Sequence, residues 1–191
     1  MEREIHEEET GSRPAPGDLA LVQAFVNTVD IESGEEQLAT PGALEAWLRS
    51  HGLLVDGPSL TDADLRLAIT SREALRALAY ANHEGETDPA ALSTLDRVAA
   101  TARLRMRFDQ HGPRLEPELP GIDGALGRLL SIVYASMVEG SWSRLKACRR
   151  DTCRWAFYDR SRNRTSSWCT MAVCGNREKA RAYRLRRRQE A

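Results

Sequence analysis

The stretch CRRDTCRWAFYDRSRNRTSSWCTMAVCGNR, residues 148–177, holds all four cysteines of this 191-residue chain. They form two C-x4-C pairs, and fifteen residues separate the pairs. Two close pairs on either side of a short loop are the arrangement that a tetrahedral zinc ion requires. The last histidine of the chain is His111, so the local donors are four thiolates, a set that suits a structural ion. We therefore expect one structural Zn2+ bound by Cys148, Cys153, Cys169 and Cys174.

Two disulfides are the alternative use of four cysteines, and free structural thiols or a redox switch are others. Residues 1–9 are acidic and lack the apolar segment of a secretory signal. No apolar run in the sequence approaches the length of a membrane span. We therefore expect a cytoplasmic protein without membrane contact, in which reduced thiols favour metal binding.

Charge is distributed unevenly along the chain, although the formal net charge is only -1. Residues 144–191 contain 15 basic and 4 acidic side chains, a balance of +11, whereas residues 1–143 contain 12 basic and 24 acidic ones, a balance of -12. An even distribution would place roughly 7 basic residues in the final segment. Arginine accounts for 25 of the 27 basic residues, which a GC-rich genome would also produce, but such a bias does not explain their position. The basic segment indicates contact with an anionic polymer such as nucleic acid.

The sequence before the cysteines predicts a mainly α-helical domain at residues 17–143, after an acidic disordered tail at residues 1–16. Apolar residues recur at helical spacing in residues 18–29, 41–52, 61–69, 70–85, 88–98 and 121–139. Pro41 in a first turn, a capping box of Thr61 with Asp64, and Asp88-Pro89 mark the predicted starts of three of them. The fourth of these helices is expected to begin at Thr70 or Ser71. Leu104, Met106 and Phe108 alternate with arginines, which predicts a half-buried strand in one short hairpin.

Within residues 144–191 we expect a short strand at 154–158, a basic loop at 160–167 and a helix that Gly175-Asn176 caps. A structural role for this helix is compatible with nucleic-acid contact: Ala180, Tyr183 and Leu185 would pack inward, and its arginines would form only the solvent face. Seven arginines on the loop and on one helix face are the candidate nucleic-acid-binding residues: Arg160, Arg162, Arg164, Arg177, Arg181, Arg184 and Arg188. The aromatic residues could stack bases, but in so small a module we expect Trp155, Phe157 and Trp168 to form its core.

The final segment closely resembles the CGNR-type zinc finger through Cys148-x4-Cys153, the run Arg154-Trp155-Ala156-Phe157-Tyr158-Asp159, Trp168-Cys169 and Cys174-Gly175-Asn176-Arg177. The N-terminal part resembles the ABATE domain through Leu19-Ala20-Leu21, Phe25-Val26-Asn27-Thr28 and Leu44-x2-Trp47-Leu48. This resemblance implies a bacterial protein of a stress-related transcription regulator family. It also implies a treble-clef-like zinc module at residues 144–191, whose second cysteine pair lies at the N-terminus of a helix.

The combined prediction is a transcription regulator that binds duplex DNA through the zinc-stabilised basic module. The α domain would form a homodimer or sense a small-molecule effector. Asn27 and Thr28 are polar residues on an otherwise apolar helix, so they are candidate ligand-binding residues, with local hydrogen bonds at the helix end as the alternative. RNA or ribosome binding is the alternative function. We expect the two parts to unfold separately when zinc is removed.

We expect no enzymatic activity. The sequence contains no H-E-x-x-H motif, no phosphate-binding glycine loop and no Ser or Cys elbow. His83 falls at the end of a predicted helix, where a solvent-facing polar residue is normal, and His51 and His111 stand beside glycines in predicted turns.

Overall fold

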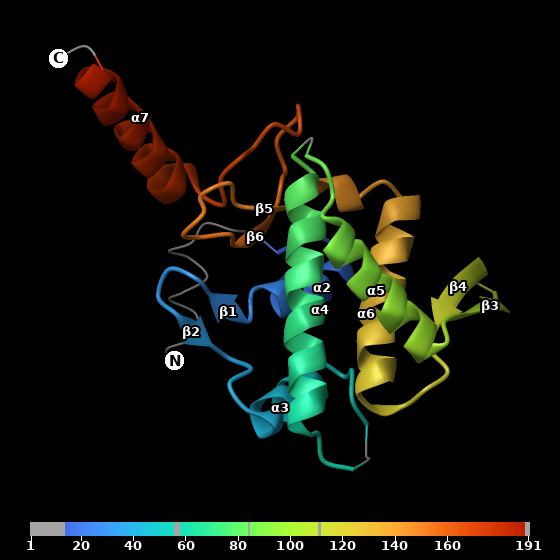
Figure 1. The fold of residues 1–191 in the computed structure, drawn as a ribbon. Helices are drawn as coiled ribbons and strands as arrows, with labels where there is room; N and C mark the ends of the chain where they lie inside the picture. Colours follow the sequence, from blue (N-terminus) through green and yellow to red (C-terminus); the bar gives the residue numbers. More distant parts are fainter. Residues whose placement is uncertain (1–13, 56–57, 84, 111, 190–191) are drawn as a thin grey trace.

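A computed structural model describes residues 14–55, 58–83, 85–110 and 112–189 of the chain. Its central helix α4 (Asp62–Ala81) lies beside α5 (Pro89–Ala102) and α6 (Gly121–Val138), with α2 (Leu19–Val26) behind it and α3 (Pro41–Ser50) at its N-terminal end (Figure 1). The fold is mainly α, as the sequence predicts. Of the predicted acidic tail, residues 1–13 lie outside the described part of the chain.

The predicted start signals of three helices operate as expected. The Thr40 hydroxyl accepts a hydrogen bond from Ala43 N at 3.1 Å, ahead of Pro41 at the first position of α3. A reciprocal capping box between Thr61 and Asp64 begins α4. Asp88 caps α5 with Pro89 in its first turn.

The core lies where α2, α3, α4 and α6 meet. Its central side chains are less than 2% exposed and come from helices far apart in the sequence: Phe25, Leu48, Leu75 and Leu129. Helix α6 is long and apolar enough to cross a membrane, with a mean hydropathy of 1.2 over 18 residues, which corrects the expectation that no segment reaches that length. Because α6 contributes Leu126, Leu129 and Val133 to this core, burial accounts for its apolar composition.

Helix α4 is continuous through the point at which the sequence predicts a new start. Thr70 and Ser71 were expected to cap a second helix, and this prediction is wrong. Their hydroxyls donate instead to the carbonyls of Arg66 and Leu67, one turn earlier, at 2.7 Å each. A hydroxyl bonded in this way does not interrupt the helix, so a cap residue inside an apolar pattern is ambiguous in sequence.

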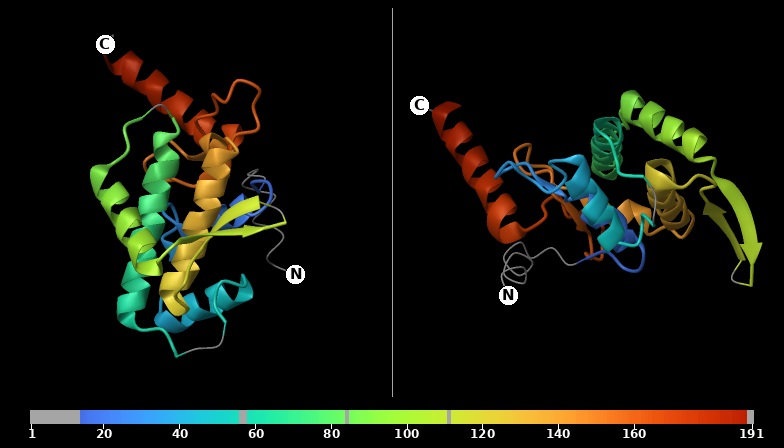
Figure 2. Two further views of the ribbon diagram at one scale, coloured as in Figure 1. Left: turned by 90° about the vertical axis from the view of Figure 1, so that its right-hand side faces the viewer. Right: turned by 90° about the horizontal axis from the view of Figure 1, so that it is seen from below.

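The predicted hairpin exists as β3 (Arg105–Asp109) paired with β4 (Gly112–Glu116), but the prediction of a half-buried strand is wrong. All residues of β3 are exposed, including Met106 and Phe108, because the hairpin projects away from the helices (Figure 2). Arg105 forms an ion pair with Glu118 along its edge. Alternation of apolar and polar residues predicts a strand with two different faces, but it does not show whether the apolar face packs against a core.

Two further short hairpins were not predicted. One pairs β1 (Val29–Asp30) with β2 (Glu35–Glu36) inside the acidic segment that follows α2. The other follows a 3-10 turn, η1 (Trp142–Arg144), and pairs β5 (Leu145–Ala147) with β6 (Ala156–Tyr158). Leu145, Ala147 and Ala156 belong to the same core as the helices, so this hairpin joins the cysteine-containing segment to the bundle.

The chain ends in a π turn, η2 (Met171–Gly175), that leads into α7 (Asn176–Gln189). Helix α7 projects from the body on the side opposite the β3–β4 hairpin (Figures 1 and 2). Its first turn contains Glu178 and its last turn Arg186, Arg187 and Arg188, an order that complements the helix dipole.

Candidate metal centre and nucleic-acid interface

The four cysteines converge on one point. Their Sγ atoms all lie within 4.8 Å of one another, with Cys169 at 3.7 Å from Cys153 and 3.6 Å from Cys174. Sulfur atoms held tetrahedrally at about 2.3 Å from a zinc ion would be about 3.8 Å apart. The cluster therefore has the dimensions of a closed four-thiolate site.

The first cysteine pair occupies the turn between β5 and β6. Cys148 N donates to Trp155 O at 2.9 Å, and Cys153 N donates to Arg150 O at 2.9 Å, which closes a tight loop around the metal position. Arg154 leaves this loop in the left-handed conformation, with φ of 51°. A hairpin with ligands in its turn, followed by a helix that begins with ligands, is the predicted treble-clef-like arrangement.

The second pair frames the start of the final helix. Thr170, which follows Cys169, caps η2 by accepting from Val173 N, and Cys174 lies inside η2. The expected cap at Gly175-Asn176 is wrong, because Asn176 is already helical and donates to Ala172 O at 3.1 Å. Gly175 is buried beside the end of the Met171 side chain, which would have to move to admit a Cβ there.

The chemistry of the donors also fits a cation. Hydrogen bonds from Cys153 and Cys169 lower the pKa of Cys148 to about 2, whereas the contact with Cys148 raises the pKa of Cys153 to about 12. The pKa of Cys169 is raised in the same way. Four sulfurs this close cannot all ionise unless a positive ion lies between them. The site is thus suited to one structural Zn2+.

Arg150 links the cysteine cluster to the α domain. Burial opposes its charge, but hydrogen bonds with Glu32 and with the Cys174 sulfur outweigh this effect and raise the pKa of Arg150. Glu32 lies in the β1–β2 turn, 2.9 Å from Arg150, and also pairs with Arg177 in the first turn of α7. An acidic turn of the α domain therefore contacts both the metal loop and the basic helix.

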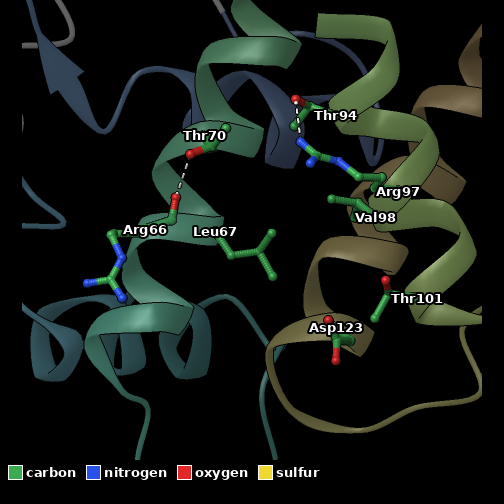
Figure 3. Close-up of a pocket in the computed structure, with 8 residues that line it drawn as sticks. All are labelled: Arg66, Leu67, Thr70, Thr94, Arg97, Val98, Thr101 and Asp123. Atoms are coloured by element: carbon green, nitrogen blue, oxygen red, sulfur yellow. Dashed lines mark hydrogen bonds between the residues drawn. The ribbon is translucent and has the colours of Figure 1, made fainter. Parts of the chain in front are cut away.

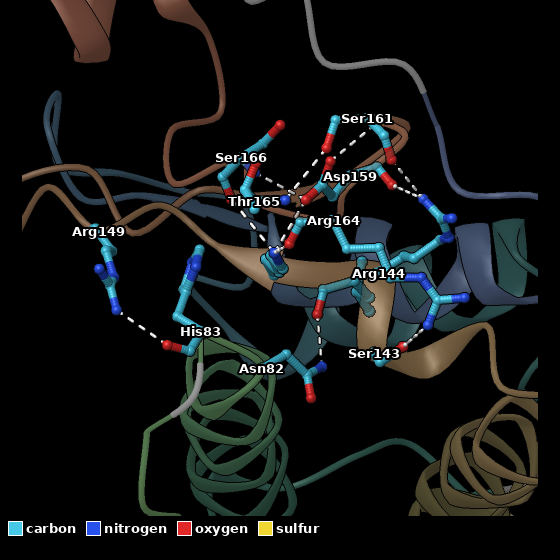
Figure 4. Close-up of polar contacts among 12 residues, drawn as sticks. Asn82, His83, Ser143, Arg144, Arg149, Asp159, Ser161, Arg164, Thr165 and Ser166 are labelled. Atoms are coloured by element: carbon cyan, nitrogen blue, oxygen red, sulfur yellow. Dashed lines mark hydrogen bonds and ion pairs between the residues drawn. The ribbon is translucent and has the colours of Figure 1, made fainter.

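A buried ion pair organises the basic loop at residues 160–167 (Figure 4). Lys146 Nζ lies 2.9 Å from Asp159 Oδ2, and the two side chains are 4% and 0% exposed. Asp159 also accepts from the backbone N of Ser161 at 2.9 Å and of Ser166 at 3.0 Å, while Lys146 donates to Arg164 O. Burial opposes ionisation of Asp159, but the contacts with Ser161, Lys146 and Ser166 lower its pKa below the ordinary value. The loop is held from both its ends.

The arginines predicted to bind nucleic acid are exposed, and they lie on two elements. Arg160, Arg162 and Arg164 are on the loop, where Arg160 donates to Pro14 O at 2.8 Å and Arg164 to Ser143 Oγ at 3.3 Å. The others are on α7: Arg177, Arg181, Arg184 and Arg188. At about 100° per residue these four share one face of the helix.

The expectation that α7 packs inward through Ala180, Tyr183 and Leu185 is wrong. Tyr183 is 55% exposed, Leu185 is 50% exposed, and Ala180 is also exposed. The module is too small to provide a surface for them, so α7 stands free of the body beyond η2 (Figure 1). In contrast, Phe157 is buried, as its expected core role requires, whereas Trp155 and Trp168 are only half-buried.

Asn27 and Thr28 are engaged by the protein itself. The Asn27 amide donates to Ala156 O at 2.9 Å and accepts from Ala156 N at 2.7 Å, as a neighbouring strand would. The Thr28 hydroxyl donates to Phe25 O at 2.9 Å and accepts from Arg72 at 3.1 Å. These contacts support the alternative, local hydrogen bonding for Thr28, and give Asn27 a role in joining α2 to β6.

Several polar residues at the same junction were not identified from sequence. Arg76 is buried on α4 and donates to Arg154 O at 2.9 Å, and Asn82 donates to Leu145 O at 2.8 Å. His83 was expected to face solvent, but it is buried against Phe157 with Nε2 at 2.7 Å from Ala147 O, and burial lowers its pKa. Arg149 donates to His83 O at 3.0 Å (Figure 4). No spacing in the sequence marked them, because they come from α4, the turn after it and the loop that follows β5.

The α domain also contains a cavity of about 350 Å³ between α4 and α5. Thr94, Arg97 and Val98 of α5 face Leu67 and Thr70 of α4 across it (Figure 3). Neither of the predicted ligand residues, Asn27 and Thr28, lines this cavity. Of the other histidines, His51 stacks on Trp47 at 3.9 Å between ring centroids, and His111 lies outside the described residues.

Two family models match the chain. The ABATE model, described as "Putative stress-induced transcription regulator", matches residues 10–139. The model of the CGNR zinc finger matches residues 144–187. A search of curated proteins finds no match.

Proposed function

The chain belongs to the ABATE family and carries a CGNR zinc finger, and from this we propose that it is a transcription regulator that binds duplex DNA through its zinc module. The single observation that supports DNA binding best is the free-standing helix α7, whose arginine face is exposed along its whole length. Fourteen residues of helix are about 21 Å long, enough to follow a groove across several base pairs.

In this proposal the metal supplies folding energy, and the arginines supply affinity. Zinc fixes the hairpin turn to the first turn of the helix, so that α7 has a defined direction. Arg177, Arg181, Arg184 and Arg188, together with the loop arginines, neutralise phosphates and release counterions. Guanidinium groups also permit bidentate contacts with guanine.

The helical domain serves this function by dimerisation or by binding a small effector. A single helix gives limited sequence specificity, and two copies on neighbouring half-sites would raise it. The cavity between α4 and α5 is of the size that a small molecule requires. We further propose that the protein acts in the cytoplasm as a binding protein without catalytic activity.

Charge reversal on the two faces of α7 tests the DNA contact. The variant Arg181→Glu/Arg184→Glu changes the arginine face, and Lys179→Glu/Arg186→Glu makes the same change in net charge on the opposite face. We expect the first variant to bind duplex DNA at least about tenfold more weakly, with a salt slope reduced by about 2. Equal loss in both variants would show a nonspecific charge effect, and full affinity in the first would show that the face is not used.

Selection from random duplex DNA and RNA pools by the zinc-loaded protein at physiological salt distinguishes DNA from RNA binding. We expect a reproducible DNA motif. Enrichment of a structured RNA, with affinity well above that for duplex DNA at equal salt, would instead favour RNA or ribosome binding. Sedimentation with the selected duplex would then measure whether the protein binds as a dimer.

A further inference from the structure

A second cavity, of about 700 Å³, lies within the zinc module. It is open to solvent and is bordered by the end of β6, the basic loop and residues 168–172. It is therefore lined in part by the basic loop, and its other border, residues 168–172, precedes α7 in the chain. Its volume is in the range of pockets that hold a small organic ligand.

The lining combines three kinds of group. Tyr158 and Trp168 are half-buried aromatic residues, and the Arg160 guanidinium lies over the Tyr158 ring at 5.8 Å from its centroid. Ser166 and Ser167 add hydroxyl groups, and the Ser166 side chain also hydrogen-bonds to Asp159. Aromatic faces stack nucleobases, hydroxyls bond base edges, and arginine binds phosphate.

The cavity is formed before any ligand arrives. The Lys146–Asp159 ion pair and the backbone bonds from Ser161 and Ser166 fix the loop that makes one wall. A ligand would therefore not have to order this loop, which lowers the entropic cost of binding. Because Lys146 neutralises Asp159, the buried carboxylate does not repel an anion.

We propose that this cavity binds a single unstacked nucleotide, with its base against Tyr158 and Trp168 and its phosphate at Arg160. The nucleotide comes from an unpaired position of a bound nucleic acid or from a free mononucleotide, since both present the same base and phosphate. For the nucleic-acid source, the inference rests on the proposed function. Extrusion of a base costs least where it is already unpaired, so a bulge is the natural probe.

The test compares a duplex with the same duplex that carries one unpaired adenosine, using zinc-loaded full-length protein. Ser166→Leu fills the cavity and gives up the Ser166 side-chain bond to Asp159, and Asn163→Leu places a leucine on the same loop outside the lining. We expect wild type and Asn163→Leu to prefer the bulged duplex by roughly fivefold or more, as stacking of one base provides. Ser166→Leu should lose this preference while its affinity for the plain duplex is unchanged.

A second variant guards against misfolding. Arg160→Gln keeps the exposed loop position and removes the phosphate contact, so it should reduce the preference for the bulge as well. Zinc content and circular dichroism of both variants should equal those of wild type. A bulge preference that persists undiminished in Ser166→Leu and Arg160→Gln would overturn the proposal.

Adenosine monophosphate, titrated alone and followed by NMR, separates the two sources. Equal affinity for bulged and plain duplex, with monophosphate binding that Ser166→Leu abolishes, would assign the cavity to a free nucleotide. Absence of both effects rejects the cavity as a nucleotide site. If the plain duplex is not bound at all, the proposed DNA function fails, and the monophosphate titration still decides the cavity.

Discussion

Asp159 contributes more to the stability of the zinc module than its position between Tyr158 and Arg160 in the sequence suggests. It is 1% exposed, it pairs with Lys146, and it accepts backbone bonds from both ends of the basic loop. Removal of one member of a buried pair leaves the other charge without a partner, which costs far more than loss of a surface pair.

We expect Asp159→Asn to lower the free energy of unfolding by about 3 kcal/mol at pH 7. Asp151→Asn is the matched control, because that side chain is 76% exposed and its pair with Arg154 should contribute less than about 1 kcal/mol. Because the folded-state pKa of Asp159 is lowered, its stabilisation is complete above the unfolded value near 4 and is lost as the pH falls further. Denaturant titrations should show the gap between wild type and Asp159→Asn narrowing below about pH 4; a constant gap would contradict this.

Single residues differ in how far sequence reveals them. The four cysteines could be predicted because ligand type and spacing are local properties of the chain. Asn27, His83 and Arg76 could not, because each acts on a backbone group more than sixty residues away. The sequence shows that such a side chain is polar, but it does not show which distant backbone group is its hydrogen-bond partner.

Among the elements, the β1–β2 turn has a direct relation to the basic helix. Its Glu32 occupies Arg150 and Arg177, two cations that would otherwise be available to phosphate. Helix α7 makes its other close contacts mainly with η2, so this turn is the α domain's main polar contact with it. A carboxylate in this position competes with DNA for the same guanidinium groups.

We expect Glu32→Gln to raise the affinity for duplex DNA several-fold and to steepen the salt dependence by up to about 2, because two more cations can then meet phosphates. Glu35→Gln, in the adjoining strand β2 and without an ion pair to Arg150 or Arg177, should leave both the affinity and the salt dependence unchanged. Fluorescence anisotropy over a range of salt concentrations would measure the effect. Weaker binding by Glu32→Gln would show that Glu32 positions α7 rather than competing for it.

The sequence predicted which segments are helices or strands better than it predicted what those segments pack against. Apolar spacing and capping residues located the helices, because these signals depend on neighbouring residues alone. The apolar residues of β3 and α7 were predicted to be buried, but they are exposed. Their spacing is the same as that of a strand or helix with one buried face. The split of α4 failed for the same reason, since a hydroxyl can cap a helix or bond back within it.

At the scale of the whole molecule, the zinc module and the helical domain share one core. Leu145, Ala147 and Ala156 lie in one core with the helices, where β5 packs against α4 and β6 against α2, and the polar contacts of Asn27, Arg76 and His83 surround them. The expectation that the two parts unfold separately therefore needs revision. Loss of the metal would free the β5–β6 turn and uncover part of the core of the helices.

We expect removal of zinc by a strong chelator to lower the midpoint of thermal unfolding of the helices by about 6–12 °C, in one transition. Loss of roughly 3 kcal/mol of shared packing corresponds to a shift of this size in a chain of this length. Far-ultraviolet circular dichroism reports the helices. The fluorescence of Trp142, Trp155 and Trp168, measured in a Trp47→Phe variant because Trp47 lies on α3, reports the module and its junction with them. If the helical signal keeps its midpoint while the fluorescence changes, the parts are independent after all.

The pairing of Asn27 with the Ala156 peptide bears on how such proteins are inherited and engineered. A gene fusion or recombination event near residue 143 would separate the Asn27 side chain from the Ala156 peptide group that it binds. It would also leave an exposed apolar face on both products. We therefore expect that the zinc finger cannot be transferred to another protein without the helices that it packs against. Exchange of segments between related proteins should give soluble products only when α2, α4 and the zinc finger are transferred together. The solubility of chimeras that take these three parts from one parent, compared with chimeras that take them from two, would test this.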